Sequence, residues 1–382
     1  MDVFTASFDG HPGAEFSATM MIWTPLTLLV SSSTLVKTKQ EESEMNTSVI
    51  GLDIAKNIFH LYTLNADNKV IKKKLKRAQV LTFFANYPVS TIGIEACGSS
   101  HYWARELTKL GHEVMLLNAK FVKSFLVGNK NDFNDAQAIF DAVGRPNKRV
   151  VAIKTEVQQD MQLLHNLRQD LVKRRTAVVN QIRGALLERG IAIHKGVDQV
   201  RKQLPDILED AENGLTALCR ELIAEQAERL RELDKAIKEQ DKRLGRLSQA
   251  DALSRRMLDV PGVGPITATI VASDIGDGKG YASSRDYAAS LGLVPGQHSS
   301  GDKPRYLGIS KRGNRYIRTN LIHGARAVVR NCAGKTDQLS RWLQALVERR
   351  GFNKAAVALA NKNARILWAM TMKNEAYQGA PA

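Results

Sequence analysis

Four acidic residues, far apart along the chain, have the residue types and settings that a metal-dependent reaction requires. Asp53 ends the otherwise apolar segment SVIGLD, and Glu95 lies inside the apolar segment TIGIEA. Asp132 and Asp135 stand three positions apart in NDFNDAQAI, so both carboxylates can lie on one face of a helix. Because burying a carboxylate is costly unless it is paired, hydrogen-bonded or metal-bound, two such acids in neighbouring strands call for a partner, and a divalent cation would suit both.

Each acid also has a simpler structural interpretation. Asp132 and Asp135 could be stabilised in a first helical turn by the helix macrodipole alone. Asp53 could cap a strand end, and Glu95 could form a buried salt bridge with a lysine. Taken together, however, the four can hold divalent ions that polarise a phosphodiester. Mg²⁺ prefers such oxygen ligands, and Mn²⁺ is the alternative.

A serine pair followed by a basic segment is the second candidate site. The segment HSSG places Ser299 and Ser300 before a glycine in a predicted loop. Most Ser-Gly pairs are only turns, and a serine hydroxyl is a poor nucleophile until a base, metal or cation activates it.

Residues 301–330 contain eight Lys or Arg against one acid, with Tyr306 and Tyr316 among them. Cations neutralise phosphates and aromatic rings stack on bases, which favours a nucleic-acid face over a merely solvated basic surface. The predicted nucleic-acid-binding side chains are those of Lys303, Arg305, Lys311, Arg312, Arg315 and Arg318. In PGVGPITA, which is similar to a helix-hairpin-helix element, Gly262 and Gly264 are predicted to open backbone N–H groups to a DNA phosphate.

The composition agrees with a soluble nucleic-acid-binding protein. The 382 residues carry a formal net charge of +16, which favours a polyanionic partner. A membrane surface is the rival partner, but we find no continuous apolar span of about 18 residues that could cross a bilayer. The three cysteines form no CxxC motif, which indicates a reducing cytoplasm and argues against a zinc site or a disulfide framework.

The elements that must position these residues are predicted by their hydrophobic periodicity. Short apolar segments predict strands, which lie at 48–53, 58–65, 69–76, 91–96 and 112–118. Helices are predicted at 78–87 and 101–111, which gives a mixed sheet with helices on both faces. A further helix beginning near Asp132 would pack on that sheet.

Long helices follow from about residue 154, with apolar residues spaced alternately by three and four. This stripe comprises Leu164, Leu167, Leu171, Val178, Ile182 and Ala185, and then Leu230, Leu233, Ile237, Leu244 and Leu247. It predicts a helical hairpin or coiled coil, formed either within one chain or between chains.

Four segments are therefore expected along the chain. They are an N-terminal extension (1–45) that is mobile or a mis-assigned start, a domain carrying the acids (46–150), a helical connector (151–250) and a C-terminal domain carrying the serine (251–382). The extension contains MMIWTPLTLLV, which has the length of a signal-peptide core but lacks a basic flank and a cleavage site.

The blocks GLDIAK, GIEACGSS and NKNDFNDAQAI resemble those of the DEDD-type transposases of bacterial insertion sequences. These are relatives of the Piv/MooV DNA invertases and are known as bridge-RNA-guided recombinases. The segment 291–325 resembles the C-terminal transposase domain of the same family. One departure is Cys97, where many relatives have a threonine.

The resemblance implies an α/β plus α protein: a RuvC-like (RNase H-type) N-terminal domain, a helical or coiled-coil connector and a mainly helical C-terminal domain. It implies that Asp53, Glu95, Asp132 and Asp135 are catalytic metal ligands. It also implies that Ser300 is the nucleophile, with Ser299 as the fallback.

The implied activity is that of a transposase or recombinase that cuts and rejoins DNA in the bacterial cytoplasm. The implied partners are the element ends, the target DNA and a structured non-coding guide RNA. A homo-oligomer, a dimer or a tetramer, would bring the acids of one subunit to the serine of another. The alternatives are a RuvC-like metal-dependent nuclease that uses water, a DNA invertase without an RNA guide, and a non-catalytic nucleic-acid-binding protein.

Overall fold

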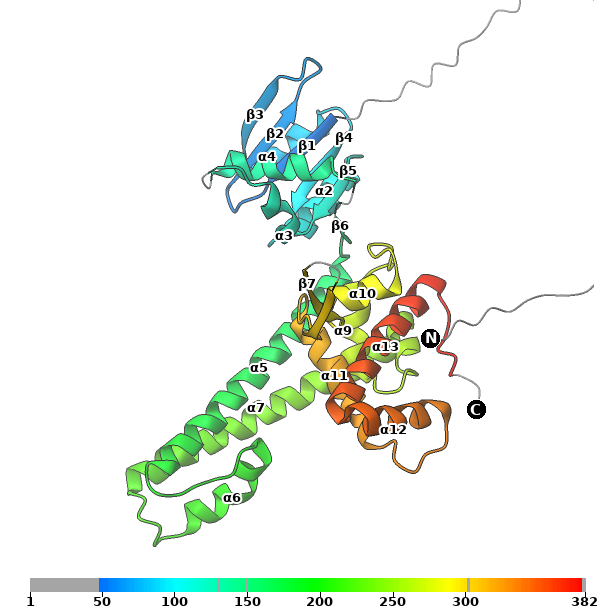
Figure 1. Ribbon diagram of the computed structural model, residues 1–382. Helices are drawn as coiled ribbons and strands as arrows, with labels where there is room; N and C mark the ends of the chain where they lie inside the picture. Colours follow the sequence, from blue (N-terminus) through cyan, green and yellow to red (C-terminus); the bar gives the residue numbers. More distant parts are fainter. Residues whose placement is uncertain (1–47, 129–130, 147, 149, 301–302, 380–382) are drawn as a thin grey trace, which may run out of the picture. The chain divides into compact units, whose positions relative to one another are not determined.

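The computed structural model describes residues 48–379 except 129–130, 147, 149 and 301–302 (Figure 1). The predicted N-terminal extension over residues 1–45 lies outside the described residues. Among the helices of the described part, none has the length and apolar character that crossing a bilayer would require.

A six-stranded mixed sheet forms the N-terminal part, with the strand order β3-β2-β1-β4-β5-β6. The first three strands pair antiparallel, whereas β4 runs parallel to β1 and β5 parallel to β4. The strands are β1 (Ser48–Asp53), β2 (Ile58–Leu64), β3 (Val70–Lys76), β4 (Ser90–Glu95), β5 (Glu113–Leu117) and β6 (Val150–Val151). The five predicted strands closely match β1 to β5. The sixth has only two residues, too few to leave a periodic pattern in the sequence.

Helices cover both faces of this sheet, as predicted, because its strands alternate between two apolar cores. Ile50 and Leu52 point to the core that contains Trp103, while Val49 packs against the core that contains Ile139. The first face carries α1 (Val80–Ala85) after a 3₁₀ turn, η1 (Arg77–Gln79), and then α2 (Ser100–Lys109). The second face carries α3 (Ala119–Val122), the turn η2 (Lys123–Phe125) and α4 (Asp132–Val143).

Two long helices form the connector, and they pack against each other within the chain. They are α5 (Glu156–Leu187) and α7 (Ala217–Ala250), with α6 (Val197–Glu209) between them in sequence. The ion pairs Arg168–Asp241 and Arg175–Asp234 show that α5 and α7 run antiparallel. The predicted hairpin is therefore intramolecular. Val178, Ile182 and Leu230 of the predicted stripe are buried, whereas Leu167 is 52% exposed.

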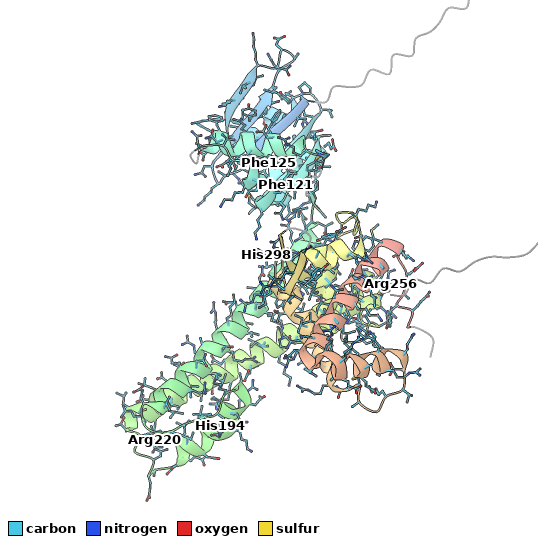
Figure 2. The ribbon with its side chains drawn as sticks, in the orientation of Figure 1. Phe121, Phe125, His194, Arg220, Arg256 and His298 are labelled. Atoms are coloured by element: carbon cyan, nitrogen blue, oxygen red, sulfur yellow. The ribbon has the colours of Figure 1, made fainter. Side chains whose placement is uncertain are left out.

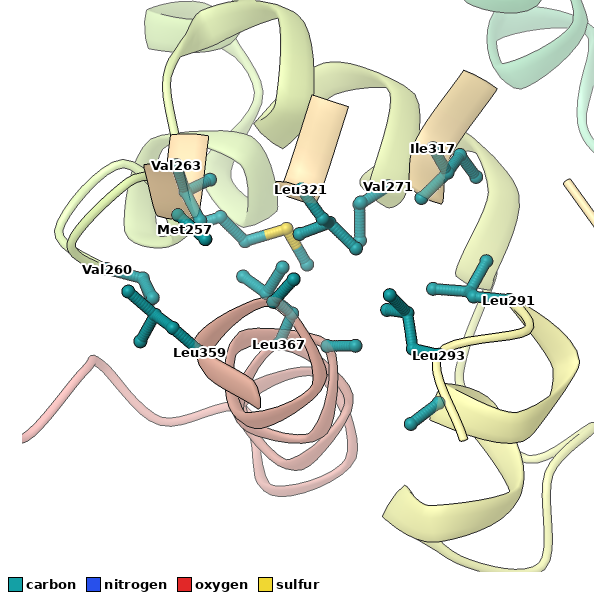
Figure 3. Close-up of a cluster of buried hydrophobic side chains, with 14 of the residues drawn as sticks. Met257, Val260, Val263, Val271, Leu291, Leu293, Ile317, Leu321, Leu359 and Leu367 are labelled. Atoms are coloured by element: carbon teal, nitrogen blue, oxygen red, sulfur yellow. The ribbon is translucent and has the colours of Figure 1, made fainter. Parts of the chain in front are cut away.

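The C-terminal part is mostly helical and surrounds one core, in which Met257, Leu321 and Leu367 meet (Figure 3). Its helices are α8 (Ala252–Met257), α9 (Pro265–Ile275), α10 (Ser284–Ser290), α11 (Arg315–Arg330), α12 (Gln338–Arg350) and α13 (Phe352–Lys373). Helices α8 and α9 contact each other across the turn that contains PGVG.

The segment with the serine pair is a β-hairpin, β7 (Pro295–Ser300) and β8 (Lys303–Ile309). In the backbone register Ser299 pairs with Pro304 and Ser300 with Lys303. The loop predicted at the two serines is therefore wrong, because both belong to a strand and the turn comes after them. The sequence did not reveal the strand because the described side chains of 297–298 and 305–308 are all exposed, so no apolar alternation marks it.

Candidate metal centre and nucleic-acid face

Three of the four predicted acids converge where β1 ends and α4 begins. Asp53 is the last residue of β1, and Asp132 and Asp135 occupy the first turn of α4. One ligand atom from each of the three lies within 4.8 Å of the other two. Carboxylates that are distant in sequence thus share one small region, as the sequence predicted.

Glu95, the fourth acid, borders the same region. It is the last residue of β4, and the parallel register that pairs Leu52 with Ile94 carries Glu95 to the side of Asp53. Burial raises the pKa of the Glu95 carboxyl above its usual value, and the negative charge of Asp135 raises it further. Glu95 therefore lies near Asp135, although the three acids whose ligand atoms lie within 4.8 Å of one another are Asp53, Asp132 and Asp135.

Two glycines allow α4 to lie close enough to the sheet for this convergence. Gly51 and Gly93 are register partners on β1 and β4, each two residues before the acid of its strand. A Cβ atom on Gly51 would stand 2.1 Å from the carbonyl oxygen of Ala136, and one on Gly93 would stand 2.3 Å from a methyl group of Val143. Both glycines lie on the face that α4 covers. A larger side chain at Gly51 would meet the backbone of α4 and push the helix and its two aspartates outward, whereas one at Gly93 would meet the side chains of Val143 and Ile139.

The first turn of α4 is fixed by a side-chain cap. The Asn131 side-chain oxygen accepts a hydrogen bond from the Phe133 backbone N–H. The helix macrodipole then stabilises Asp132 and Asp135, as the simpler interpretation required. It does not account for Asp53 and Glu95, which come from strands.

The donor set of this centre suits a hard divalent cation. All four candidate ligands are carboxylates, which Mg²⁺ and Mn²⁺ prefer. Negative charge is concentrated here, and it also affects the neighbouring Cys97. The pKa of the Cys97 thiol is raised first by burial and then by the charges of Glu95 and Asp53. A bound cation would relieve this repulsion.

Residues at the centre that the sequence did not reveal come from the neighbouring strands. His60 of β2 places its Nε2 atom 3.6 Å from Oδ2 of Asp132. Lys72 and Lys74 of β3 place their ammonium groups 5.8 and 5.6 Å from the centre of the Phe133 ring. The signal that could have found His60 is its polar side chain in the otherwise largely apolar segment IFHLYTL.

The predicted serine site is at the end of β7. The side chains of Ser299, Ser300 and Lys303 lie outside the described part of the structure. His298, which Figure 2 labels on this hairpin, is exposed and pairs in register with Arg305. Tyr306 of β8 is 69% exposed. The hairpin thus presents basic and aromatic side chains beside the backbone position of Ser300.

The base of the hairpin is tightly packed. A Cβ atom on Gly313 would lie 1.7 Å from the carbonyl oxygen of Ser290, and one on Gly292 would lie 2.4 Å from the backbone nitrogen of Arg312. Both glycines also have positive φ angles, which L-residues with side chains rarely adopt. The segments that flank the hairpin are therefore held against each other.

The predicted basic face divides into exposed and buried members. Arg305, Lys311, Arg312 and Arg315 are exposed. Arg318 is only 7% exposed, and its Nη1 atom donates to the carbonyl oxygens of Leu291 and Arg312 at 2.8 and 2.7 Å. The Arg318 guanidinium thus holds the base of the hairpin, and its burial does not support the nucleic-acid contact predicted for it.

The two glycines of the PGVG turn also differ. Gly262 has a φ of +85°, and a Cβ atom there would lie 2.9 Å from the carbonyl oxygen of Gly324 in α11. Close packing of the turn against α11 therefore explains why position 262 is a glycine. Gly264 is exposed and is the N-cap residue of α9.

Comparison with known proteins identifies relatives over most of the chain. A family model described as "Transposase IS116/IS110/IS902 family" matches residues 254–340, and a transposase model for the DEDD domain of IS110 elements matches residues 50–190. A probable family 20 transposase of Pseudomonas aeruginosa is 46% identical over 336 residues, which covers 87% of this chain and 99% of that protein.

Two further relatives are transposases of named insertion sequences. The transposase of IS1111A from Coxiella burnetii is 42% identical over 89% of this chain and 94% of its own length. The transposase of IS1328 from Yersinia enterocolitica is 38% identical over 87% of this chain and 99% of its own length.

Proposed function

Because the chain belongs to the IS110/IS116 family of DEDD transposases, enzymes that cut and rejoin DNA, we propose that it does so with Ser300 as nucleophile beside a four-carboxylate metal centre. The observation that carries this proposal is the convergence of Asp53, Asp132 and Asp135 within 4.8 Å. We also propose that the N-terminal domain is RuvC-like, an RNase H-type fold. The three antiparallel strands followed by two parallel ones support this assignment.

The proposed metal ligands are Asp53, Glu95, Asp132 and Asp135, with Mg²⁺ or Mn²⁺ as the ion. Divalent ions held there would polarise the phosphodiester and stabilise the attacking and leaving oxygens. The protein's own contribution is to hold the four carboxylates together against their mutual repulsion. The close packing of α4 against Gly51 and Gly93 supports that role.

In the proposed step, the Ser300 hydroxyl attacks a DNA phosphorus. A bond forms between Oγ and phosphorus as the bond from phosphorus to one deoxyribose oxygen breaks. The serine proton leaves to a base or to solvent, and the released sugar oxygen takes up a proton. Attack by a sugar hydroxyl on the phosphoserine reverses the step and rejoins DNA. The position of Ser300 at the end of a basic hairpin supports it as the residue that meets the phosphate.

We further propose that the exposed basic side chains bind element ends and target DNA, and that a structured non-coding RNA guides the choice of sites. The support for DNA is the exposure of Arg305, Lys311, Arg312 and Arg315; the support for RNA is the family resemblance. A homo-oligomer, a dimer or a tetramer, completes the proposal. The exposure of Leu163 and Leu167 on α5, at 55% and 52%, supports an association of copies.

The experiment that tests the chemistry compares Ser300→Ala with Ser299→Ala. Both variants keep the four acids, so both should bind metal like the wild type. We expect Ser300→Ala to lose strand exchange and the covalent protein–DNA adduct on a plasmid that carries the element ends, whereas Ser299→Ala keeps both. DNA cleavage that persists without an adduct in Ser300→Ala would favour the alternative, a nuclease that uses water. Loss of activity in Ser299→Ala alone would move the nucleophile to Ser299.

A separate experiment tests the RNA. The protein, expressed together with the DNA that flanks its gene, is purified and the co-purifying RNA is sequenced. We expect one dominant structured RNA encoded beside the gene, with segments complementary to donor and target. Strand exchange by RNA-free protein would contradict RNA guidance and favour an invertase-like enzyme that reads DNA directly.

A further inference from the structure

His60 lies beside the four carboxylates although the mechanism above does not use it. In the antiparallel pairing of β1 with β2, His60 is the direct partner of Asp53, so both side chains point to the face that α4 covers. The His60 side chain is only 6% exposed, and its Nε2 atom is 3.6 Å from Oδ2 of Asp132. One imidazole thus stands next to two of the proposed ligands.

The other ring nitrogen indicates which tautomer a neutral His60 ring adopts. Nδ1 of His60 is buried and has no hydrogen-bond partner among the described residues. A neutral imidazole carries its hydrogen on one nitrogen only, and the nitrogen that faces a carboxylate is the one that gains from carrying it. The hydrogen therefore belongs on Nε2, directed at Asp132, and Nδ1 keeps its lone pair.

The ring orientation is fixed by an aromatic neighbour. Phe133 packs edge to face on His60, with ring centroids 4.9 Å apart. Asp132 itself is held much less, because its side chain is 64% exposed. An exposed aspartate samples several rotamers, and fixing one of them costs conformational entropy. A buried, oriented donor beside it would select the rotamer in advance.

We infer that His60 is a positioning residue of the metal centre. It donates from Nε2 to one carboxylate oxygen of Asp132 and so presents the other oxygen to the ion. The separation of 3.6 Å is longer than a hydrogen bond, so the contact shortens when an ion draws Asp132 into place. Outer partners of this kind orient metal ligands, and removing one typically costs 10- to 100-fold in metal affinity. The inference rests on the proposed function, because it requires the carboxylates to bind metal.

The first test measures Mn²⁺ binding by the metal-free, full-length protein with isothermal titration calorimetry. His60→Phe keeps an aromatic ring against Phe133 but removes the donor, and we expect its Kd for Mn²⁺ to rise about 10- to 100-fold. His60→Gln restores a donor near the position of Nε2 and should recover most of the affinity. A wild-type Kd in a folded His60→Phe variant would reduce His60 to a packing role and overturn the inference.

The second test uses the wild-type protein, so its result does not depend on whether a variant folds. In wild-type protein with ¹⁵N-labelled histidine, saturation with Mg²⁺ should shift the ring signals of His60. His112 is the internal control, because it is also buried and both of its ring nitrogens already have partners, the Ser90 N–H and the Phe84 carbonyl. Ring signals of His60 that move no more than those of His112 would overturn the inference.

Failure of the underlying proposal gives a different result. If neither the wild type nor Asp53→Asn binds Mn²⁺, then the proposal of a metal centre is wrong, and the proposed role of His60 is wrong as well. If the wild type binds and Asp53→Asn does not, the metal centre holds. The His60 variants then decide the inference alone.

Discussion

Gly51 of β1 packs against Ala136 of α4 so closely that a Cβ atom on Gly51 would lie 2.1 Å from the Ala136 carbonyl oxygen. Real side chains do not tolerate such a distance to a backbone atom, so the contact exists only because the residue is glycine. Asp53 stands two residues after Gly51, and Asp135 one residue before Ala136. The closeness of helix and sheet therefore determines whether carboxylates from both can reach one ion.

The Gly51→Ala variant tests this relationship. The added methyl group must push α4 away from β1, and overpacking of this kind typically costs about 1–3 kcal/mol in the free energy of unfolding. Because Asp132 and Asp135 move with α4, we expect Mn²⁺ affinity to fall at least about tenfold as well. Chemical denaturation and calorimetric titration measure the two effects.

The matched control for this substitution is Gly245→Ala in the interior of α7, where a Cβ atom would meet nothing within 4 Å. Alanine is the better helix former, so this variant should gain up to about 1 kcal/mol and bind Mn²⁺ unchanged. A Gly51→Ala variant with normal stability and normal metal affinity would show that α4 has room that the structure does not indicate.

The acids and their strands were predictable from the sequence, whereas the contacts that bring them together were not. An acid that ends an apolar strand, such as Asp53, is anomalous by itself, and the anomaly is visible in the sequence. The need for glycine at Gly51 and Gly93 depends on which helix crosses them, a property of the tertiary packing. The position of His60 depends on the register between β1 and β2. A shift of one residue would turn its side chain to the opposite face of the sheet.

Glu95 should make the stability of the metal-free protein depend on pH. Burial and the charge of Asp135 raise the pKa of Glu95 in the folded state above its ordinary value of 4.5. As the pH rises above 4.5, the unfolded chain therefore releases this proton first, and the folded state loses stability relative to it. In the presence of a chelator, urea denaturation should show a steeper decline in stability for the wild type than for Glu95→Gln, because the other acids with raised pKa values, Asp141 and Asp274, remain in both proteins.

If the proposed metal centre holds, divalent metal should reverse this pH effect in the wild type, because the ion would bind the ionised carboxylates. The stabilisation by Mg²⁺ should accordingly grow as the pH rises through the raised pKa of Glu95. Glu95→Gln should show a smaller gain from Mg²⁺ at every pH. Identical pH profiles for the wild type and Glu95→Gln, with and without metal, would show that Glu95 takes no part in metal binding.

Arg315 and Arg318 look alike in sequence, but the structure places them in different environments, because Arg315 is exposed and Arg318 is buried. Arg318→Met leaves the carbonyl oxygens of Leu291 and Arg312 without their buried donor. We expect a loss of about 2–4 kcal/mol in the free energy of unfolding, because each unsatisfied buried group costs about 1–3 kcal/mol. Thermal or chemical denaturation provides the measurement.

Arg315→Ala, at the exposed start of α11, is the counterpart of that variant. Its stability should change by less than about 0.5 kcal/mol. Its affinity for duplex DNA should fall, and the slope of log affinity against log salt should decrease by about one unit if a phosphate contact is lost. If Arg318→Met kept full stability but bound DNA more weakly, Arg318 would have to contact nucleic acid, as the sequence predicted.

The basic segment shows why charge alone does not identify an interface. A run of Lys and Arg predicts a polyanionic partner, and four of the predicted side chains are indeed exposed. Helix α11, however, buries one face of its 3.6-residue period, and that face includes Ile317, Arg318 and Leu321. An arginine on such a face must find partners inside the protein. Which carbonyl groups those are depends on the hairpin that precedes the helix.

His165 predicts an acid-sensitive contact between α5 and the C-terminal helices. It is fully buried, and its ring nitrogens bond to the hydroxyl groups of Tyr316 and Thr269 at 3.2 and 3.0 Å. Burial lowers its pKa from 6.5 to about 4, with a further contribution from the positive charge of Arg168. The unfolded chain therefore takes up this proton first as the pH falls, so stability should be lost between about pH 6.5 and 4. Since each unit of pKa shift corresponds to about 1.4 kcal/mol, the loss should approach 3 kcal/mol.

The His165→Gln variant isolates this effect, because glutamine keeps hydrogen-bonding groups at the site but does not titrate. His101 also has its pKa lowered to about 4 and remains in both proteins, so its contribution cancels in the comparison. At pH 7 the wild type should be the more stable of the two, because glutamine cannot reproduce both hydrogen bonds. The difference should shrink as the pH falls, and below pH 5 the variant should unfold at the higher urea concentration. Parallel stability curves for the two proteins from pH 7 to pH 4 would mean that His165 accepts its proton without breaking these contacts.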